Sequence, residues 1–249
     1  MYANNPNLYN QLSHINIIPQ MEAGGLLGSG KYFDVDDRKL HKFPAIDTDP
    51  NWVYVNPNPE LYCMEYQSIV KGFGFIPQRC LECWKVVVVP RSFHELMLLL
   101  ELEEKMVHKN PRCWCKCGTE ARDFVPRNYG GYFYTKGKEQ GLVRLKTVRE
   151  EVAEHISPEI RVILKRYCTE FELRFGPSDT YKPPVHARDT EKKFWENVDI
   201  TIGARRQPQI IIDNVIQSWM IFATGRGDKT VELYNGGKPI FIPSLTYEE

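Results

Sequence analysis

Residues 83–109 read CWKVVVVPRSFHELMLLLELEEKMVHK, and this stretch decides much of the fold. Its four consecutive valines, residues 86–89, predict a buried strand that the following proline ends. Ser92 and Glu95 then have the S-x-x-E spacing of a helix capping box. Apolar residues recur behind the box at steps of three and four, so we predict a helix from about residue 92 to residue 108.

Two cysteine clusters flank this strand and helix. One is the C-x2-C pair of residues 80–83, and the other reads CWCKCG over residues 113–118. Structural zinc takes four tetrahedral thiolate or imidazole ligands, and a C-x2-C turn aims two sulfurs at one point. We therefore predict one structural zinc ion with these ligands: Cys80, Cys83, Cys115 and Cys117, with Cys113 as the alternative to Cys115.

The second cluster resembles the second knuckle of zinc ribbons, in which glycine lets the backbone curl around the metal. The resemblance covers about 40 residues and implies a β part pinned by zinc. Two features depart from that family, since the second pair is C-x-C and a strand plus a helix separate the knuckles. Buried free cysteines and a redox-active C-x-x-C remain the alternatives.

Composition and charge describe a globular intracellular protein. The 249 residues contain 32 Lys plus Arg and 32 Asp plus Glu, so no global field attracts nucleic acid or an anionic membrane. Seven is an odd number of cysteines, and their clustering favours metal ligation in a reducing compartment over disulfides. The N-terminus lacks the pattern of a secretory signal, and no apolar run is long enough to span a membrane.

The rest of the chain predicts an α+β fold. Alternating residues over 130–146 predict a β-hairpin, a capping box at residue 147 opens a short helix, and an apolar stripe from Ile160 to Phe171 predicts another helix. Further helices are expected around Phe194 and over 208–224, and Asn-Gly at 235–236 indicates a C-terminal hairpin. The β part, a zinc-ribbon-like unit with an inserted helix, would pack against these helices.

The predicted domain organisation is an extended loop-rich arm followed by one zinc-stabilised domain. The arm covers residues 1–60, which are rich in Asn, Pro, Gly and Asp. The domain covers residues 61–249 and has three parts: the zinc-knuckle part 71–146, the helical part 147–224 and the terminal hairpin 229–243.

Local basic residues suggest a phosphate-facing surface despite the zero net charge. The predicted nucleic-acid-binding set is Arg161, Lys165, Arg166 and Arg174 on one helix, with Arg205 and Arg206 in a loop. Aromatic residues at 84, 114 and 134 are candidates for stacking on bases. We therefore predict a non-enzymatic, zinc-binding interaction protein that acts in transcription, replication or repair, with a protein partner and with nucleic acid as a second candidate partner.

Two other functions remain open. The chain is alternatively a structural or assembly component of a particle, in which the arm wraps neighbouring subunits. It is otherwise a metal-dependent nuclease or hydrolase that uses Asp34 and Asp36 of the arm as hard oxygen ligands. The G-x-x-x-x-G-K spacing of residues 25–31 is interpreted as a loop, because a tyrosine stands where a phosphate-binding loop needs Ser or Thr.

Overall fold

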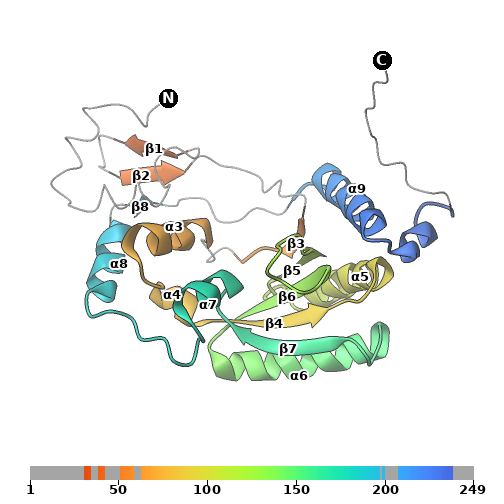
Figure 1. The fold of residues 1–249 in the computed structure, drawn as a ribbon, viewed down its shortest axis with the longest axis horizontal. Coiled ribbons are helices and arrows are strands. Elements are labelled where there is room, and N and C mark those ends of the chain that lie inside the picture. The colour runs from red at the N-terminus through yellow and green to blue at the C-terminus, as the bar shows by residue number, and fades with distance from the viewer. Residues whose placement is uncertain are drawn as a thin grey trace, which may run out of the picture. The chain divides into compact units, whose positions relative to one another are not determined.

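The computed structural model describes residues 31–34, 39–42, 51–58, 63–196, 198–199 and 207–237 (Figure 1). The chain divides into two compact units. Unit 1 takes its described residues from the ranges 1–46, 58–83 and 166–205, and unit 2 from 47–57, 84–165 and 206–249. Each unit is therefore assembled from segments that are distant in the sequence.

Unit 2 contains a five-stranded antiparallel sheet in the order β3-β5-β6-β4-β7. The strands are β3 (Trp52–Asn56), β4 (Cys83–Val89), β5 (Cys115–Thr119), β6 (Tyr129–Lys136) and β7 (Arg161–Arg166). Helix α5 (Phe93–Lys109) connects β4 to β5, and α6 (Lys138–His155) connects β6 to β7. The run β4-α5-β5-β6-α6-β7 has the order of the split β-α-β motif, and β3 extends its sheet beside β5.

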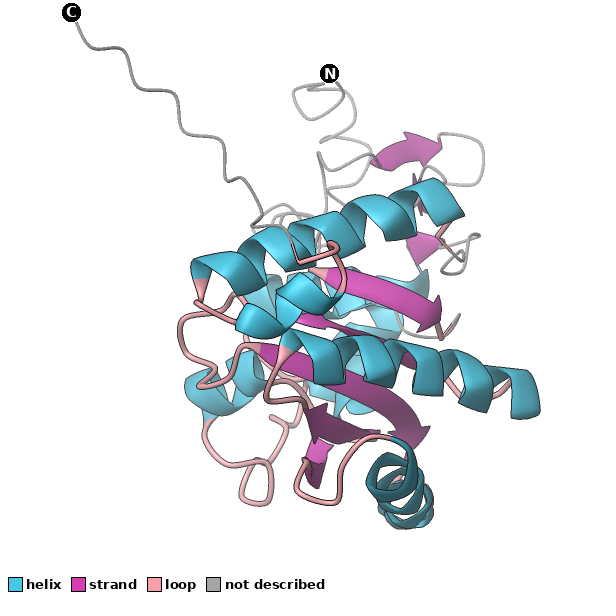
Figure 2. Ribbon diagram, turned by 90° about the vertical axis from the view of Figure 1, so that its right-hand side faces the viewer, coloured by secondary structure: helices cyan, strands magenta, loops and turns pink. Residues whose placement is uncertain are grey.

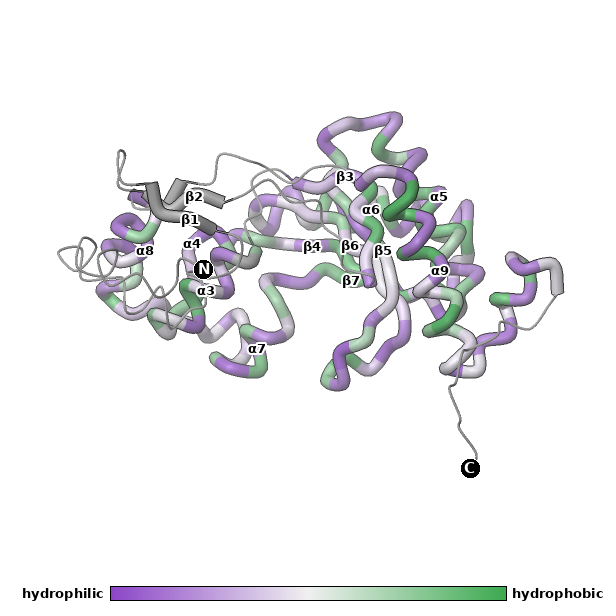
Figure 3. The backbone as a smooth tube through the Cα atoms, turned by 90° about the horizontal axis from the view of Figure 1, so that it is seen from above, coloured by the Kyte–Doolittle hydropathy of each residue, from purple (hydrophilic) through white to green (hydrophobic). Residues whose placement is uncertain are grey.

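One face of this sheet packs against helices α5, α6 and α9 (Gln209–Gly225). Successive side chains of a strand point to opposite faces, so only every second strand residue contacts these helices. Val86 and Val88 of β4 belong to the core shared with these helices, whereas Val87 belongs to a separate cluster on the other face. The turned view in Figure 2 shows long helices alongside the strands. In Figure 3, hydrophobic and hydrophilic residues alternate along α5 and α9, as amphipathic packing requires.

The strand, the capping box and the helix predicted from residues 83–109 are confirmed. Ser92 is the N-cap of α5 and its side chain accepts a hydrogen bond from the Glu95 backbone N–H at 3.2 Å. The Glu95 carboxylate in turn accepts a hydrogen bond from the Arg91 backbone N–H at 2.7 Å. The helix predicted over residues 208–224 is confirmed as α9, and the one around Phe194 as α8 (Ala187–Glu196).

The β-hairpin predicted over residues 130–146 is wrong in its second half. Gly137 has a φ of 82°, which turns the chain out of β6, and α6 begins at the next residue and continues through the predicted capping box at residue 147. Val148 and Val152 of α6 face the core four residues apart, which is a helical spacing. Leu142 and Val143, whose apolar character suggested a strand, are exposed.

The helix predicted from Ile160 to Phe171 is also wrong. Residues 161–166 form β7, in which Val162 packs in the core of unit 2 and Ile163 on the opposite face. Tyr167 follows with a φ of 32°, and α7 (Thr169–Phe175) begins two residues later. Adjacent apolar residues such as these fit the period of a helix as well as that of a strand. Pairing with β4 in the sheet makes the strand the stable choice.

The sheet of unit 2 is not a zinc ribbon, so that part of the predicted α+β class is not supported. At the C-terminal end, the described residues form a 3₁₀ helix, η2 (Lys229–Leu233), and a turn through Asn235 and Gly236. The strand that a hairpin over 229–243 requires before this turn is therefore replaced by η2. Its second strand would fall on residues outside the described range.

Unit 1 contains four helices and a small sheet among its described residues. The helices are α3 (Cys63–Phe73), α4 (Gln78–Leu81), α7 and α8, and the sheet has the order β1 (Lys31–Asp34), β2 (Lys39–Lys42), β8 (Val198–Asp199). Ile69, Phe75, Phe171 and Phe194 are among the side chains that form its core. Most of the predicted arm lies outside the described residues. Within the described ranges, no helix combines the length and the apolar character needed to cross a membrane.

Candidate nucleic-acid interface

The face of the sheet that points away from α5, α6 and α9 carries aromatic side chains on two strands. Trp52 and Tyr54 lie on β3, and Tyr132 and Tyr134 lie on β6. Trp52 and Tyr132 are buried and meet edge to face, with ring centroids 5.4 Å apart. Tyr54 and Tyr134 are half-buried. We call this surface, together with Val87, Val89 and Ile163, the aromatic face.

Two lysines lie against the rings of the aromatic face. The Lys116 Nζ is 4.0 Å from the centroid of the Trp52 ring and 4.9 Å from that of Tyr54. Lys116 stands directly opposite Tyr132 in the β5–β6 ladder, which brings its Nζ within 5.9 Å of that ring as well. Lys85 of β4 lies 5.8 Å from the Tyr134 centroid. Cation–π contacts of this kind hold the lysines beside the rings, where Lys116 is half-buried and Lys85 is buried.

A charged network closes one end of the aromatic face. The buried Glu120 carboxylate accepts hydrogen bonds from the Tyr132 hydroxyl at 2.6 Å and from the Arg122 Nε at 2.8 Å. Burial alone would raise the pKa of Glu120, but these hydrogen bonds and the charge of Arg127 hold it below its ordinary value. Glu120 is therefore ionised at neutral pH and fixes the position of the Tyr132 ring.

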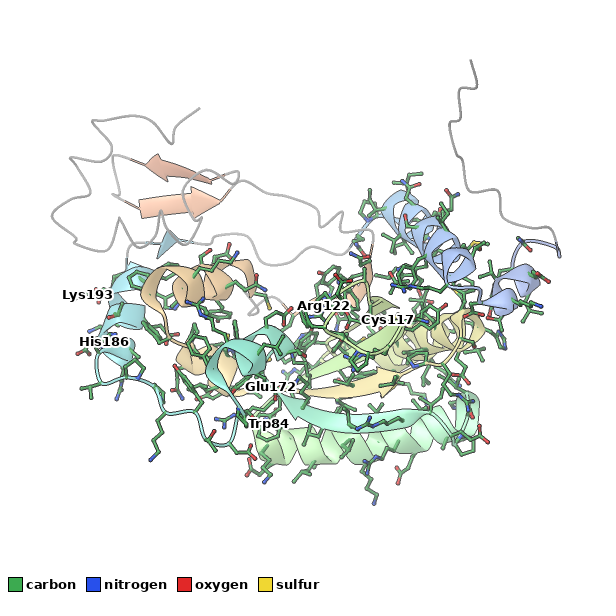
Figure 4. All side chains as sticks on the ribbon, viewed as in Figure 1. Trp84, Cys117, Arg122, Glu172, His186 and Lys193 are labelled. Atoms are coloured by element: carbon green, nitrogen blue, oxygen red, sulfur yellow. The ribbon has the colours of Figure 1, made fainter. Side chains whose placement is uncertain are left out.

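A cavity of about 400 Å³ lies beside this network. Its wall includes the guanidinium groups of Arg122, Arg127 and Arg226 and the carboxylates of Glu120 and Asp123. Figure 4 shows Arg122 near β3 and β5. The Arg127 Nε is buried and has no hydrogen-bond partner among the described residues. Guanidinium and carboxylate groups therefore line the cavity together, and the Arg127 Nη2 donates a hydrogen bond to the Tyr132 hydroxyl at 2.8 Å.

The structure separates the predicted basic residues. Arg161 and Lys165 each stand two residues from Ile163 on β7, so their side chains lie on the same side of the sheet as Ile163, which is the aromatic face. Arg166 instead donates hydrogen bonds to the carbonyl oxygens of Leu81 at 2.7 Å and Ser178 at 3.0 Å within unit 1. This contact connects the end of α4 to the segment after α7 and gives Arg166 a structural role.

Of the other basic residues of that set, Arg174 does not extend the surface as predicted, and the other two are not tested. Arg174 lies on α7 in unit 1, with its guanidinium 5.3 Å from the Phe175 ring centroid. Arg205 and Arg206 lie outside the described residues. The single basic helix stripe expected from the sequence is wrong, because its residues fall on β7 and α7.

Of the four aromatic residues of this face, the sequence patterns indicated only Tyr134 as a stacking residue. The signal that identifies them is the two-residue spacing of Trp52 and Tyr54 in WVYVN (52–56) and of Tyr132 and Tyr134 in YGGYFYTK (129–136). Trp84, also named, is on β4 one residue before Lys85, so by strand alternation it belongs to the opposite face. Trp114 is the third residue predicted to stack on bases, and its carbonyl oxygen accepts a hydrogen bond from the Tyr134 N–H at 2.9 Å.

The predicted zinc ligands are divided between the two units. Cys80 is buried in α4 within the core of unit 1, and Cys83 begins β4 at the unit boundary. Cys115 and Cys117 are buried on the helix-facing side of β5 in unit 2, where Figure 4 labels Cys117. The C-x-C segment is an extended strand and not a turn. Zinc binding by this set of residues stays a prediction.

Other candidate metal groups receive no support from the described residues. No three or more of their His, Cys, Asp and Glu side chains are arranged around one point as metal ligands would be. Asp34 is the last residue of β1, and Asp36 lies outside the described residues, as does most of the segment 25–31. The hydrolase alternative therefore stays a prediction.

Comparison of the chain with models of protein families, with curated proteins and with solved structures gives no match. The function is therefore argued from the geometry of the site alone.

Proposed function

We propose that this chain binds single-stranded nucleic acid on its aromatic face and works as a non-enzymatic module of a larger nucleic-acid-handling assembly. The observation that carries the proposal is Lys116 seated among three aromatic rings on one face of an antiparallel sheet. Sheet faces of this composition bind unpaired bases by stacking and bind the backbone by charge.

The half-buried members of the face are the expected contact residues. Tyr54 and Tyr134 retain exposed ring surface, so they are the rings on which bases would stack. Trp52 and Tyr132 are buried and support them from below. Arg161, at the β7 edge, is exposed and would contact phosphate.

Single strands fit this surface better than duplexes. Stacking requires bases that are not already paired and stacked within a helix, and it tolerates any sequence because every base has a π-face. The overall charge of zero adds no long-range attraction, so binding would depend on local contacts and would be modest in strength.

The test is fluorescence anisotropy with labelled single-stranded RNA, single-stranded DNA and duplex DNA over a range of salt concentrations. Tyr54→Ala and Tyr134→Ala should each weaken single-strand binding about 5- to 150-fold, the equivalent of about 1–3 kcal/mol per stacked base. Lys116→Gln should lower the slope of log affinity against log salt by about 0.7. Tyr234→Ala is the matched control, because Tyr234 is an exposed tyrosine of the same unit outside the aromatic face.

Two results would contradict the proposal. The first is the absence of salt-sensitive binding to any of the three nucleic acids by the folded wild-type chain. The second is binding that Tyr54→Ala and Tyr134→Ala leave unchanged while Tyr234→Ala weakens it. Circular dichroism of each variant establishes that the fold is retained.

A further inference from the structure

Glu103 is a buried carboxylate whose oxygens make no hydrogen bond of regular geometry to the described residues. Its side chain comes from α5 and is 0% exposed. A carboxylate in such a place costs several kcal/mol unless a proton or a cation compensates it. Each buried polar group left in this state needs a physical explanation, and an ion is one of the standard ones.

Three thiols lie near this carboxylate. Cys113, Cys115 and Cys117 are each at most 1% exposed and interact electrostatically with the Glu103 side chain. Cys115 and Cys117 stand two residues apart on the same side of β5, the side against which α5 packs. Cys113 precedes the strand, and Arg144 of α6 donates a hydrogen bond to its sulfur at 3.3 Å.

The backbone opposite the thiols leaves room for the carboxylate. Gly131 of β6 is the direct partner of Cys117 in the β5–β6 ladder. A Cβ at Gly131 would lie 3.1 Å from Glu103 Oε1 and 2.5 Å from Leu99 Cδ2. A side chain at position 131 would displace Leu99 and press against the Glu103 carboxylate.

We propose that Cys113, Cys115, Cys117 and Glu103 bind one thiophilic divalent cation, best matched by zinc. Three thiolates and one carboxylate form a four-ligand tetrahedral set of the types zinc prefers, whereas magnesium and calcium prefer oxygen ligands. The cation would neutralise the buried carboxylate. The whole ligand set belongs to unit 2, so this site differs from the predicted set that includes Cys80 and Cys83.

The four side chains are not arranged around one point in this structure, so closure of the site requires their rotation. Residues two apart on a strand have Cα atoms about 7 Å apart. Zinc–sulfur distances of about 2.3 Å in a tetrahedron place sulfurs about 3.8 Å apart. The thiols must therefore turn toward each other and release their protons as the metal enters, which couples binding to pH and to folding.

The experiment measures metal content and cobalt spectra of the full chain, purified under reducing conditions without chelator. We expect one zinc per chain by elemental analysis. After metal removal, titration with Co²⁺ should produce sulfur-to-cobalt charge-transfer absorption and the intense visible bands of tetrahedral cobalt, and Zn²⁺ should abolish both. Glu103→Gln should retain the charge-transfer bands and weaken affinity at least about 10-fold, and Cys117→Ser should reduce the charge-transfer intensity by about a third.

The double variant Cys80→Ser/Cys83→Ser is the matched control, because it removes two thiols and leaves the proposed set intact. It should bind cobalt as the wild type does. Loss of binding in this control, together with loss of binding in Cys117→Ser, would overturn the proposal and favour the set predicted from the sequence. A wild-type chain that is reduced, folded and free of zinc, and that develops no charge-transfer band with Co²⁺, would overturn both.

Discussion

Replacing Asp228 by alanine should destabilise unit 2 more than any other exposed or half-buried substitution considered for this chain. One oxygen of the Asp228 carboxylate accepts hydrogen bonds from the Phe93 N–H at 2.7 Å and the Tyr129 hydroxyl at 2.7 Å. The other accepts from the Thr230 N–H at 3.0 Å and the Thr230 hydroxyl at 2.7 Å. A single side chain thus connects the first turn of α5, the beginning of β6 and the N-terminus of η2.

The magnitude follows from what the substitution leaves behind. Loss of an N-cap costs about 1 kcal/mol, and the Tyr129 hydroxyl, on a residue that is only 1% exposed, would lose its acceptor at a cost of about 1–3 kcal/mol. Water can reach the half-buried Asp228 site and replaces part of the remaining bonds. We therefore expect Asp228→Ala to lower the free energy of unfolding by about 2–4 kcal/mol.

Urea unfolding followed by circular dichroism measures this change in the free energy of unfolding. A double-mutant cycle with Tyr129→Phe isolates the interaction energy between Asp228 and Tyr129. The coupling should be about 1–2 kcal/mol, because Tyr129→Phe removes the hydroxyl that Asp228→Ala leaves unsatisfied. A loss below about 1 kcal/mol for Asp228→Ala, or effects of the two changes that simply add, would refute the assigned role.

Acid should remove this stabilisation. Burial would raise the pKa of Asp228, but hydrogen bonds from Thr230, Tyr129 and the Phe93 N–H outweigh it and hold the pKa below its ordinary value. A lowered folded-state pKa contributes stability above the unfolded value of about 3.9 and loses it as the pH falls through the folded value. The stability difference between wild type and Asp228→Asn should therefore be constant near neutral pH and shrink below about pH 4.

Two further substitutions test the packing of unit 2. Gly131→Ala should lower the free energy of unfolding in urea by about 1–3 kcal/mol, because the added Cβ would meet Leu99 Cδ2 at 2.5 Å. Gly130→Ala should lower it less, because the added Cβ would lie 3.4 Å from its nearest neighbour. Equal effects of the two substitutions would contradict the assignment of the two faces of β6. Ser92→Ala should lower stability by about 1 kcal/mol through loss of the bond to the Glu95 N–H, and Ser92→Asp should restore most of it.

Sequence patterns predict the helices and strands of this fold wherever the spacing of apolar residues fits either a helix or a strand and not both. The valine run of β4 and the capping box at Ser92 each have one physical interpretation, and both are confirmed. The segment 138–155 has a weak pattern, since Leu142 and Val143 are exposed and interrupt the helical stripe. Its helix depends on the core contacts of Val148 and Val152, which are tertiary and not local.

The candidate interface was predictable in part. The sequence identified Arg161, Lys165 and Tyr134 as candidate nucleic-acid residues; Tyr134 lies on a strand as predicted, whereas Arg161 and Lys165 lie on a strand in place of the predicted helix. Their common face depends on the order of strands, which places β7 beside β4 and β3 beside β5. Strand order arises from pairings between distant segments, and the period of one segment contains no information about its partner.

Strand β5 carries both proposed sites, on opposite faces. Lys116 points to the aromatic face while its two neighbours, Cys115 and Cys117, point to the core side with Glu103. A shift of β5 by one residue would exchange the faces, burying the lysine and removing the thiols from the carboxylate. A cation bound to the cysteines would fix this register, and with it the distance from the Lys116 Nζ to the Trp52 ring. Removal of the metal should therefore weaken nucleic-acid binding through the position of Lys116, and in the Lys116→Gln variant the same treatment should have a smaller effect.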